Sequence, residues 1–158
     1  KMQVGRQDEI CVIGGESIAI EAALIATEGT VIAVEYNGDD RTTMEENVEH
    51  FGLSNIQIID HVDDASMKGL PVPSLVFLVA SASMEQELEY FTSVNPHISV
   101  VVYTLDFTVA AGIDQVFEKF NIQDKEVIQV AISKLNPSNS FVQQPAPWII
   151  SGKALPKG

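Results

Sequence analysis

The chain has 158 residues, of which 46% are hydrophobic, and its mean hydropathy is +0.14. This length and apolar content are enough for one packed core, so we expect a single domain over residues 1–158 and no extended disorder. The formal net charge is −13, from 9 Lys and Arg against 22 Asp and Glu. Because the few basic residues are scattered, the sequence argues against the basic face on which nucleic-acid binding depends.

The apolar runs are no longer than strands, which argues against a membrane partner. The sequence opens with no basic segment followed by an apolar stretch, so we expect no secretory signal. Cys11 is the single cysteine and cannot form an internal disulfide. Together these features favour a cytoplasmic location.

Short apolar runs alternate with helical patterns in the first part of the chain. In order, the pattern predicts a strand at 10–14, a helix at 16–27, a strand at 30–35, a helix at 39–51 and a strand at 55–60. Asp39 is the expected N-cap of the second helix, and Gly52 is its expected stop.

The alternation continues and then changes. The pattern predicts a strand at 74–80, a helix at 83–93, a strand at 98–105, a helix at 106–120 and two strands at 126–135 and 147–153, joined by a loop over 136–146. The last two strands have no helix between them. The fold class is therefore α/β: a mostly parallel seven-stranded sheet with a C-terminal antiparallel hairpin and helices on both faces, the layout of the Rossmann-like methyltransferase fold.

Ligands of such a sheet bind at the carboxyl ends of the strands. The first strand is followed by Gly14-Gly15-Glu16-Ser17. Glycine lets the backbone approach a ligand, and the next helix offers free N–H groups, so Gly14, Gly15 and Ser17 are candidate cofactor-binding residues. A tight turn without any ligand is the alternative interpretation.

Glu35 ends the second strand, 21 positions beyond Gly14. This spacing is typical of the acid that binds the ribose hydroxyls of a nucleotide-type cofactor. Tyr36 follows it and is placed in the same predicted site. A solvated glutamate at the end of a strand is the alternative.

The remaining strand ends give weaker signals. Asp63 is a candidate for cofactor binding, although an aspartate there would also cap the next turn. The small residues Ala80 and Ser81 would leave room for substrate, and Tyr103 would either face a ligand or pack. We expect no metal, because no Cys/His cluster has ligand spacing, and we assign no catalytic side chain.

Four stretches resemble one known family. They are IEAALIATEGTVIAVEYN (20–37), ENVEHFGLSNIQII (46–59), VIQVAISKLNP (127–137) and PWIISGK (147–153). In their order and spacing they resemble the decarboxylating precorrin and cobalt-precorrin methyltransferases of cobalamin biosynthesis. The resemblance extends over nearly the whole chain.

The resemblance implies a class I methyltransferase that uses S-adenosylmethionine as its cofactor. It also implies a tetrapyrrole substrate, a corrin-ring precursor that is methylated and decarboxylated, and a homo-oligomer, usually a tetramer. Lys134 lies near the family's basic loop and is a candidate substrate-binding residue. Because this chemistry depends on holding a sulfonium methyl in line with a ring carbon, no general base is required.

The first loop departs from the family pattern. The family reads roughly D-I-G-A-G-S-G-S-V-S-I-E-A-A, whereas this chain reads V-I-G-G-E-S-I-A-I-E-A-A, two residues shorter and with two glycines in place of three. Two hypotheses follow. Either the short loop still accepts the cofactor beside Glu35, or side chains such as Glu16 and Ile18 fill the space. The second hypothesis makes this a catalytically silent domain that serves assembly or binds protein partners.

Overall fold

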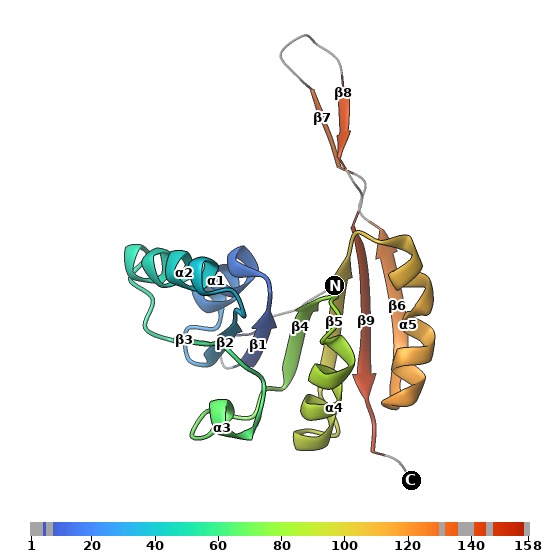
Figure 1. Cartoon of the computed structure of the whole chain (residues 1–158), viewed down its shortest axis with the longest axis horizontal. Helices are drawn as coiled ribbons and strands as arrows, with labels where there is room; N and C mark the ends of the chain where they lie inside the picture. Colours follow the sequence, from blue (N-terminus) through green and yellow to red (C-terminus); the bar gives the residue numbers. More distant parts are fainter. Residues whose placement is uncertain (1–4, 6–7, 130–131, 136–140, 145–146, 157–158) are drawn as a thin grey trace.

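The computed structural model describes residues 5, 8–129, 132–135, 141–144 and 147–156, with the side chains at 17, 132–135 and 141–144 outside the description. Seven strands form the main sheet, in the spatial order β3-β2-β1-β4-β5-β9-β6 (Figure 1). These strands are β1 (Glu9–Ile13), β2 (Thr30–Val34), β3 (Ile56–Ile59), β4 (Leu75–Val79), β5 (Ser99–Thr104), β6 (Ile122–Gln129) and β9 (Trp148–Ala154).

The pairing of the strands confirms the expected fold class. β1 pairs in parallel with β2 and β4, β2 with β3, and β4 with β5. β9 lies between β5 and β6 and is antiparallel to both. The central strands β1 and β4 are apolar throughout except for Glu9 at the start of β1, because both faces of the sheet are covered.

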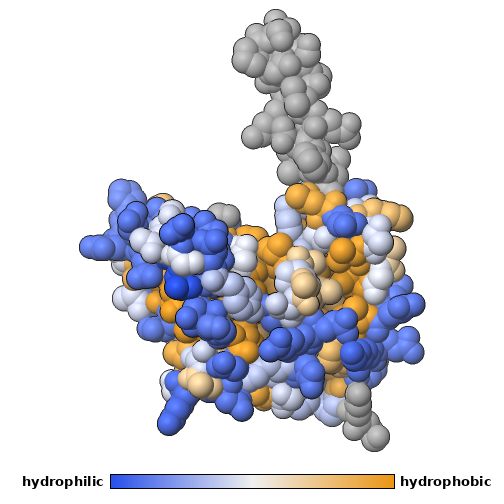
Figure 2. Space-filling view, viewed as in Figure 1, coloured by the Kyte–Doolittle hydropathy of each residue, from blue (hydrophilic) through white to orange (hydrophobic). Residues whose placement is uncertain are grey.

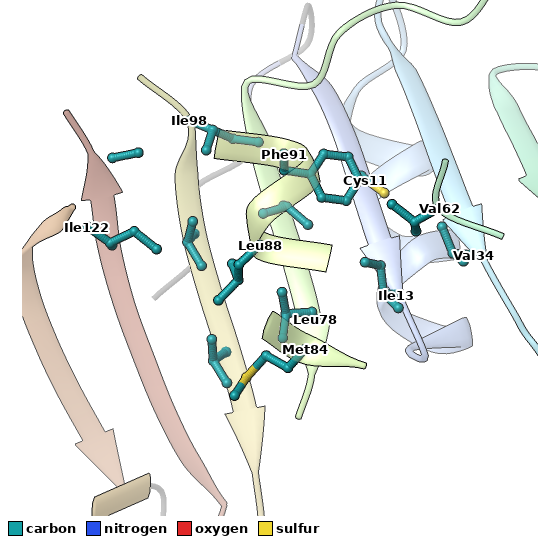
Figure 3. Close-up of a cluster of buried hydrophobic side chains, with 14 of the residues drawn as sticks. Cys11, Ile13, Val34, Val62, Leu78, Met84, Leu88, Phe91, Ile98 and Ile122 are labelled. Atoms are coloured by element: carbon teal, nitrogen blue, oxygen red, sulfur yellow. The ribbon is translucent and has the colours of Figure 1, made fainter. Parts of the chain in front are cut away.

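Helices cover the two faces of the sheet, each over its own core. α1 and α2 lie on one face, and α4 and α5 lie on the other, where Figure 3 shows the side chains of α4 packed against the strands. No helix in the described ranges is long and apolar enough to cross a membrane. The helices are α1 (Glu16–Ile25), α2 (Gly38–His50), α3 (Asp64–Met67), α4 (Met84–Val94) and α5 (Phe107–Lys119).

The start of α2 differs from the prediction. Asn37 is the N-cap, and its side-chain oxygen accepts a hydrogen bond from the Asp40 backbone N–H at 2.9 Å. Asp39, the predicted cap, lies in the first turn of the helix, where its charge is favourable. The helix ends at His50, followed by Gly52 with φ +64°, as expected of a glycine stop.

The C-terminal strands also differ from the prediction. The strand expected at 126–135 is two strands, β6 and β7 (Ile132–Leu135), and β6 begins four residues earlier than 126. The loop expected at 136–146 contains β8 (Phe141–Gln144), which pairs antiparallel with β7. β6 is an edge strand with only Ile122 buried, so its polar first half carries no apolar run that would reveal it.

β6 runs parallel to β5, because both are antiparallel to β9. Its last residue therefore lies at the same edge as the carboxyl ends of the parallel strands. Figure 1 shows the β7–β8 pair projecting from this edge as a two-stranded arm. The carboxyl edge is thus bordered by the arm at one side of the sheet and by the strand-end loops at the other.

Candidate functional site

The bend after β1 joins the ends of β1 and β2. Gly14 has φ +77°, a left-handed conformation that favours glycine. Its backbone N–H donates a hydrogen bond to the Val34 carbonyl at 3.1 Å, one residue before Glu35. The bend and the predicted ribose-binding acid are therefore neighbours at the carboxyl edge.

The first turn of α1 begins directly at this bend. Gly15 is the N-cap, and none of the described side chains makes a capping hydrogen bond there. A Cβ atom on Gly15 would lie 3.4 Å from the side chains of Phe77 and Val12, an ordinary contact distance. The amide N–H groups of the first turn are thus uncapped by any side chain that the structure describes, and they form the positive end of the helix dipole.

In the silent-domain hypothesis, the side chains of Glu16 and Ile18 fill the space of the cofactor. In the structure both side chains have other partners. The Glu16 carboxylate accepts a hydrogen bond from the Asn47 side chain of α2 at 3.0 Å. Ile18 packs against the core cluster between the sheet and helices α1 and α2. Glu16 is therefore held by α2, and Ile18 belongs to the core.

Glu35 is half-buried at the end of β2. Its backbone N–H donates to the Ile59 carbonyl at 3.0 Å, and its own carbonyl accepts from the Arg41 guanidinium at 3.0 Å. One carboxylate oxygen, Oε2, accepts from the Asn37 N–H at 3.3 Å. The other, Oε1, has no hydrogen-bond partner in the described part of the chain, so this backbone-anchored carboxylate retains acceptor capacity.

Tyr36 makes a contact that the sequence did not predict. Its hydroxyl donates a hydrogen bond of 2.5 Å to Oε2 of Glu87, a residue of α4 that is only 1% exposed. The second oxygen of Glu87, Oε1, is buried and has no partner among the described residues. Burial raises the pKa of Glu87, and the hydrogen bond from Tyr36 partly opposes that shift.

Burial also raises the pKa of Tyr36, and the hydrogen bond to Glu87 adds to the shift. One sequence signal could have found Glu87. Met84, Leu88 and Phe91 form the buried stripe of α4, and position 87 falls on the same face at helical spacing. An acid on a buried stripe is rare enough to suggest a specific role.

A pocket of about 250 Å³ lies beside this pair. It is formed by the loops after β2 and β3 together with the first turn of α4. It is smaller than the ~300–1,000 Å³ of a complete small-molecule site, so it has room for one ring system of a larger ligand. Its lining residues are Tyr36, His61, Val62, Asp63, Ser83, Gln86 and Glu87.

Two acids of the loop after β3 are engaged by local partners. Asp63 caps α3 and accepts a hydrogen bond from the Ser66 N–H at 2.7 Å, which lowers the pKa of its carboxyl group. Asp60 lies 3.0 Å from the His61 ring nitrogen Nδ1. This contact lowers the pKa of Asp60 and raises the pKa of His61. The capping role considered for Asp63 is therefore present, and the residue also lines the pocket.

The predicted substrate residues lie at the ends of β4 and β5. The Ala80 N–H donates to the Tyr103 carbonyl at 2.8 Å, and the Ser81 hydroxyl accepts from the Ser83 N–H at 3.1 Å. The Tyr103 ring packs beside Phe77, with ring centroids 6.4 Å apart. The Tyr103 ring therefore packs against the hydrophobic core.

Two predicted residues are placed only by their backbone. Ser17 lies in the first turn of α1, and Lys134 lies in β7 of the arm. Their side chains fall outside the described part of the structure. The structure thus brings Gly14, Gly15, Ser17 and Glu35 to one corner of the edge.

Exposed apolar side chains follow β5 at the same edge. Leu105 is 56% exposed, and Phe107 is 67% exposed. The Phe107 ring lies against Trp148, with centroids 5.8 Å apart. Figure 2 shows apolar surface at this end of the molecule, next to the grey atoms. No role for this surface was apparent from the sequence.

A larger surface hollow of about 600 Å³ lies at the opposite edge of the sheet. Its lining includes Ser74 and Ser99, which lie at the amino ends of β4 and β5, and Lys153 near the end of β9. Ligands of parallel sheets bind at the carboxyl ends. The candidate site is therefore the edge that carries the glycine bend and the 250 Å³ pocket.

Comparisons with solved structures agree with this architecture. A precorrin-6Y C5,15-methyltransferase from Geobacter metallireducens superposes with a TM-score of 0.84 and 19% identity, over 95% of this chain and 81% of that one. A precorrin-8W decarboxylase from Methanobacterium thermoautotrophicum gives 0.76 and 15%, over 94% and 83%. The C-terminal domain of a precorrin-6Y C5,15-methyltransferase from Rhodobacter capsulatus gives 0.74 and 20%, over 95% and 82%.

At these identities the structures show a shared fold. No curated protein sequence matches this chain closely enough to count as a relative. Residues 11–145, however, match the precorrin methyltransferase domain family along most of the chain. The chain therefore belongs to the precorrin methyltransferase domain family, which confirms both the resemblance seen in the sequence and the assignment to the methyltransferases.

Proposed function

We propose that this domain binds S-adenosylmethionine at the carboxyl edge of its sheet and methylates a corrin-ring precursor in cobalamin biosynthesis, a precorrin or cobalt-precorrin, with decarboxylation. The observation that carries this proposal is the hydrogen bond from Gly14 to Val34, which sets the glycine bend beside Glu35. Family membership supports methyl transfer as the reaction. The precorrin enzymes among the structural relatives support the substrate class.

The residues at this edge fit the parts of the cofactor. The Glu35 carboxylate has a free oxygen, and two adjacent ribose hydroxyls are donors that suit it. The first turn of α1, which no described side chain caps, suits the carboxylate of the methionine portion. Gly14 and Gly15 allow the backbone to approach, and Tyr36 borders a pocket of the size of one ring system.

When bound, this cofactor supplies an electrophilic methyl group to a ring carbon that provides the electron pair. The residues of this chain contribute by positioning the two reactants in line and by excluding water. Ala80 and Ser81 are small and leave room above β4, while Leu105 and Phe107 offer apolar surface to a flat ring. No side chain is required as a general base, and we assign none.

The substrate contacts, assembly and location extend the same proposal. Tyr103 packs on Phe77 but is only half-buried, so it would also border the substrate site, and Lys134 on the arm would meet carboxylates of the substrate. By resemblance the protein would be a homo-oligomer, a tetramer. The buried single thiol of Cys11 suits a cytoplasmic enzyme.

A second candidate function is a catalytically silent domain that serves assembly or binds protein partners. The net charge of −13 favours it, because corrin precursors carry many carboxylates and would be repelled at long range. The engagement of Glu16 by α2 and of Ile18 by the core favours the enzyme instead. Cofactor binding separates the two functions.

Calorimetric titration with S-adenosylhomocysteine tests the proposal. We expect binding by the wild type and a loss of about 1.5–3 kcal/mol in Glu35→Ala, the value of a hydrogen bond to a charged group. Glu46→Ala, at an exposed position of α2, is the matched control and should bind as the wild type does. Absence of both heat and a melting shift at millimolar ligand would favour the silent domain. Unchanged affinity in Glu35→Ala would remove Glu35 from the site.

A further inference from the structure

Glu87 is the one described side chain with a polar atom that is both fully buried and without a partner. The residue is 1% exposed, and it lines the 250 Å³ pocket. Its Oε2 is satisfied by Tyr36, while Oε1 is not satisfied by any described group. Buried acceptors are nearly always paired in folded proteins, so an orphaned one calls for a partner that the protein itself does not supply.

The other acids around the pocket are exposed, unlike Glu87, and each has a local partner. Asp63 caps α3, and Asp60 pairs with His61. Cys11 of β1 also lies near Glu87, but its burial raises the pKa of its thiol, so it adds no negative charge there. Glu87 lines the pocket, and its unpaired oxygen Oε1 is covered, so a ligand would pair with this oxygen only by displacing the side chains that cover it.

The walls of the pocket suit a flat heterocycle. Tyr36 provides an aromatic ring that is held in place through its hydroxyl group, and Val62 provides an apolar side chain. A carboxyl group accepts a hydrogen bond through an oxygen whether it is ionised or neutral. A planar base with an N–H at its edge would match both the walls and the acceptor.

We propose that Glu87 determines the base specificity of this pocket, with Oε1 accepting a hydrogen bond from the exocyclic amine of adenine. This inference rests on the proposed function, because the adenine is that of S-adenosylmethionine. It assigns the recognition of the base to α4, and it leaves Asp63, which the sequence offered as a candidate for cofactor binding, as the cap of α3.

The test compares two ligands whose bases differ at position 6 and at the adjoining N1. S-adenosylhomocysteine carries the 6-amino group beside an N1 without a hydrogen, whereas S-inosylhomocysteine carries a hydrogen on N1 and a carbonyl oxygen that would face the Glu87 oxygen. Sites built to bind an N–H group reject analogues that lack it strongly, so we expect calorimetry to show preference for the adenosyl ligand by about tenfold or more.

Glu87→Gln should abolish this preference, because an amide can turn to accept from the amine or donate to the carbonyl. We expect the ratio of the two affinities to fall to within about threefold. The matched control is Glu85→Gln, also on α4, where an exposed acid pairs with Lys119. This variant should keep the wild-type ratio.

The outcomes separate the inference from the proposed function. If the wild type binds neither ligand, the proposed function fails. If it binds S-adenosylhomocysteine but Glu87→Gln keeps the full preference, the role of Glu87 is overturned and the proposed function stands. If the melting temperature shows that Glu87→Gln does not fold, Tyr36→Phe serves as the second variant. Tyr36 is half-exposed, and this substitution removes the hydroxyl group that holds Glu87, so it should reduce the ratio of the two ligand affinities. An unchanged ratio in that variant also overturns the inference.

Discussion

Two corners of the carboxyl edge present acids in opposite physical states. At the first corner Glu35 is half-buried beside the glycine bend, with its backbone held on both sides and one carboxylate oxygen free. At the second corner Glu87 lies on the buried face of α4 and is bound by Tyr36, and its free oxygen is shielded from solvent. A partly exposed acid can remain without a ligand at little cost in stability, whereas a buried acid weakens the fold until something pairs with it.

The largest expected effect breaks the first corner. Gly14→Val should lower the free energy of unfolding by about 1–3 kcal/mol, because a β-branched residue is strained at φ +77°. Chemical denaturation measures this change. Gly112→Ala is the control, since Gly112 lies inside α5 with open space where a Cβ atom would lie, and it should instead stabilise the protein. Equal stability of Gly14→Val and the wild type would show that the bend tolerates side chains.

The next effect concerns the second corner and depends on pH. Because the pKa of Glu87 is raised in the folded protein, its contribution to stability is complete below the pKa of the unfolded chain and is lost as pH rises through the folded pKa. Glu87→Gln removes this titration. At pH values above the folded pKa of Glu87, we expect the free energy of unfolding of the variant to exceed that of the wild type by on the order of 1–3 kcal/mol. Near pH 4 we expect no difference between the two proteins.

Denaturant titrations of both proteins across this pH range supply the measurement. Subtracting the free energy of unfolding of one protein from that of the other removes the contribution of the acids that both share. This subtraction is needed because the chain has 22 Asp and Glu and a net charge of −13. A difference that is constant with pH would mean that Glu87 ionises as an ordinary surface acid does.

The smallest effect sharpens the boundary of the second corner. Asp63→Ala removes the cap of α3 and should lower the free energy of unfolding by about 0.5–2 kcal/mol, whereas Asp63→Asn keeps a capping side chain and should be nearly neutral. Denaturation and S-adenosylhomocysteine titration are measured on both variants. If Asp63→Asn loses ligand affinity without losing stability, Asp63 binds the cofactor as the sequence suggested, and the two corners share that role.

Much of the scaffold was predictable because its signals are local. Neighbouring residues in the sequence indicate β1 to β5 through their apolar runs. They indicate α1, α2, α4 and α5 through the helical spacing of apolar residues. The first half of β6 and the whole of β8 were missed for a physical reason. β6 is an edge strand with solvent on most of its side chains, and β8 exists only through its pairing with β7.

The glycine bend and Glu35 could be anticipated from the sequence by itself, because a fixed spacing along β1, α1 and β2 determines where their ends meet. The Tyr36–Glu87 pair and its pocket depend on packing, since 51 positions separate the two residues. Which of many surface acids becomes buried is decided when α4 packs on the sheet. No periodicity in the chain records which loop side chain will then reach it, so only the tertiary structure reveals this contact.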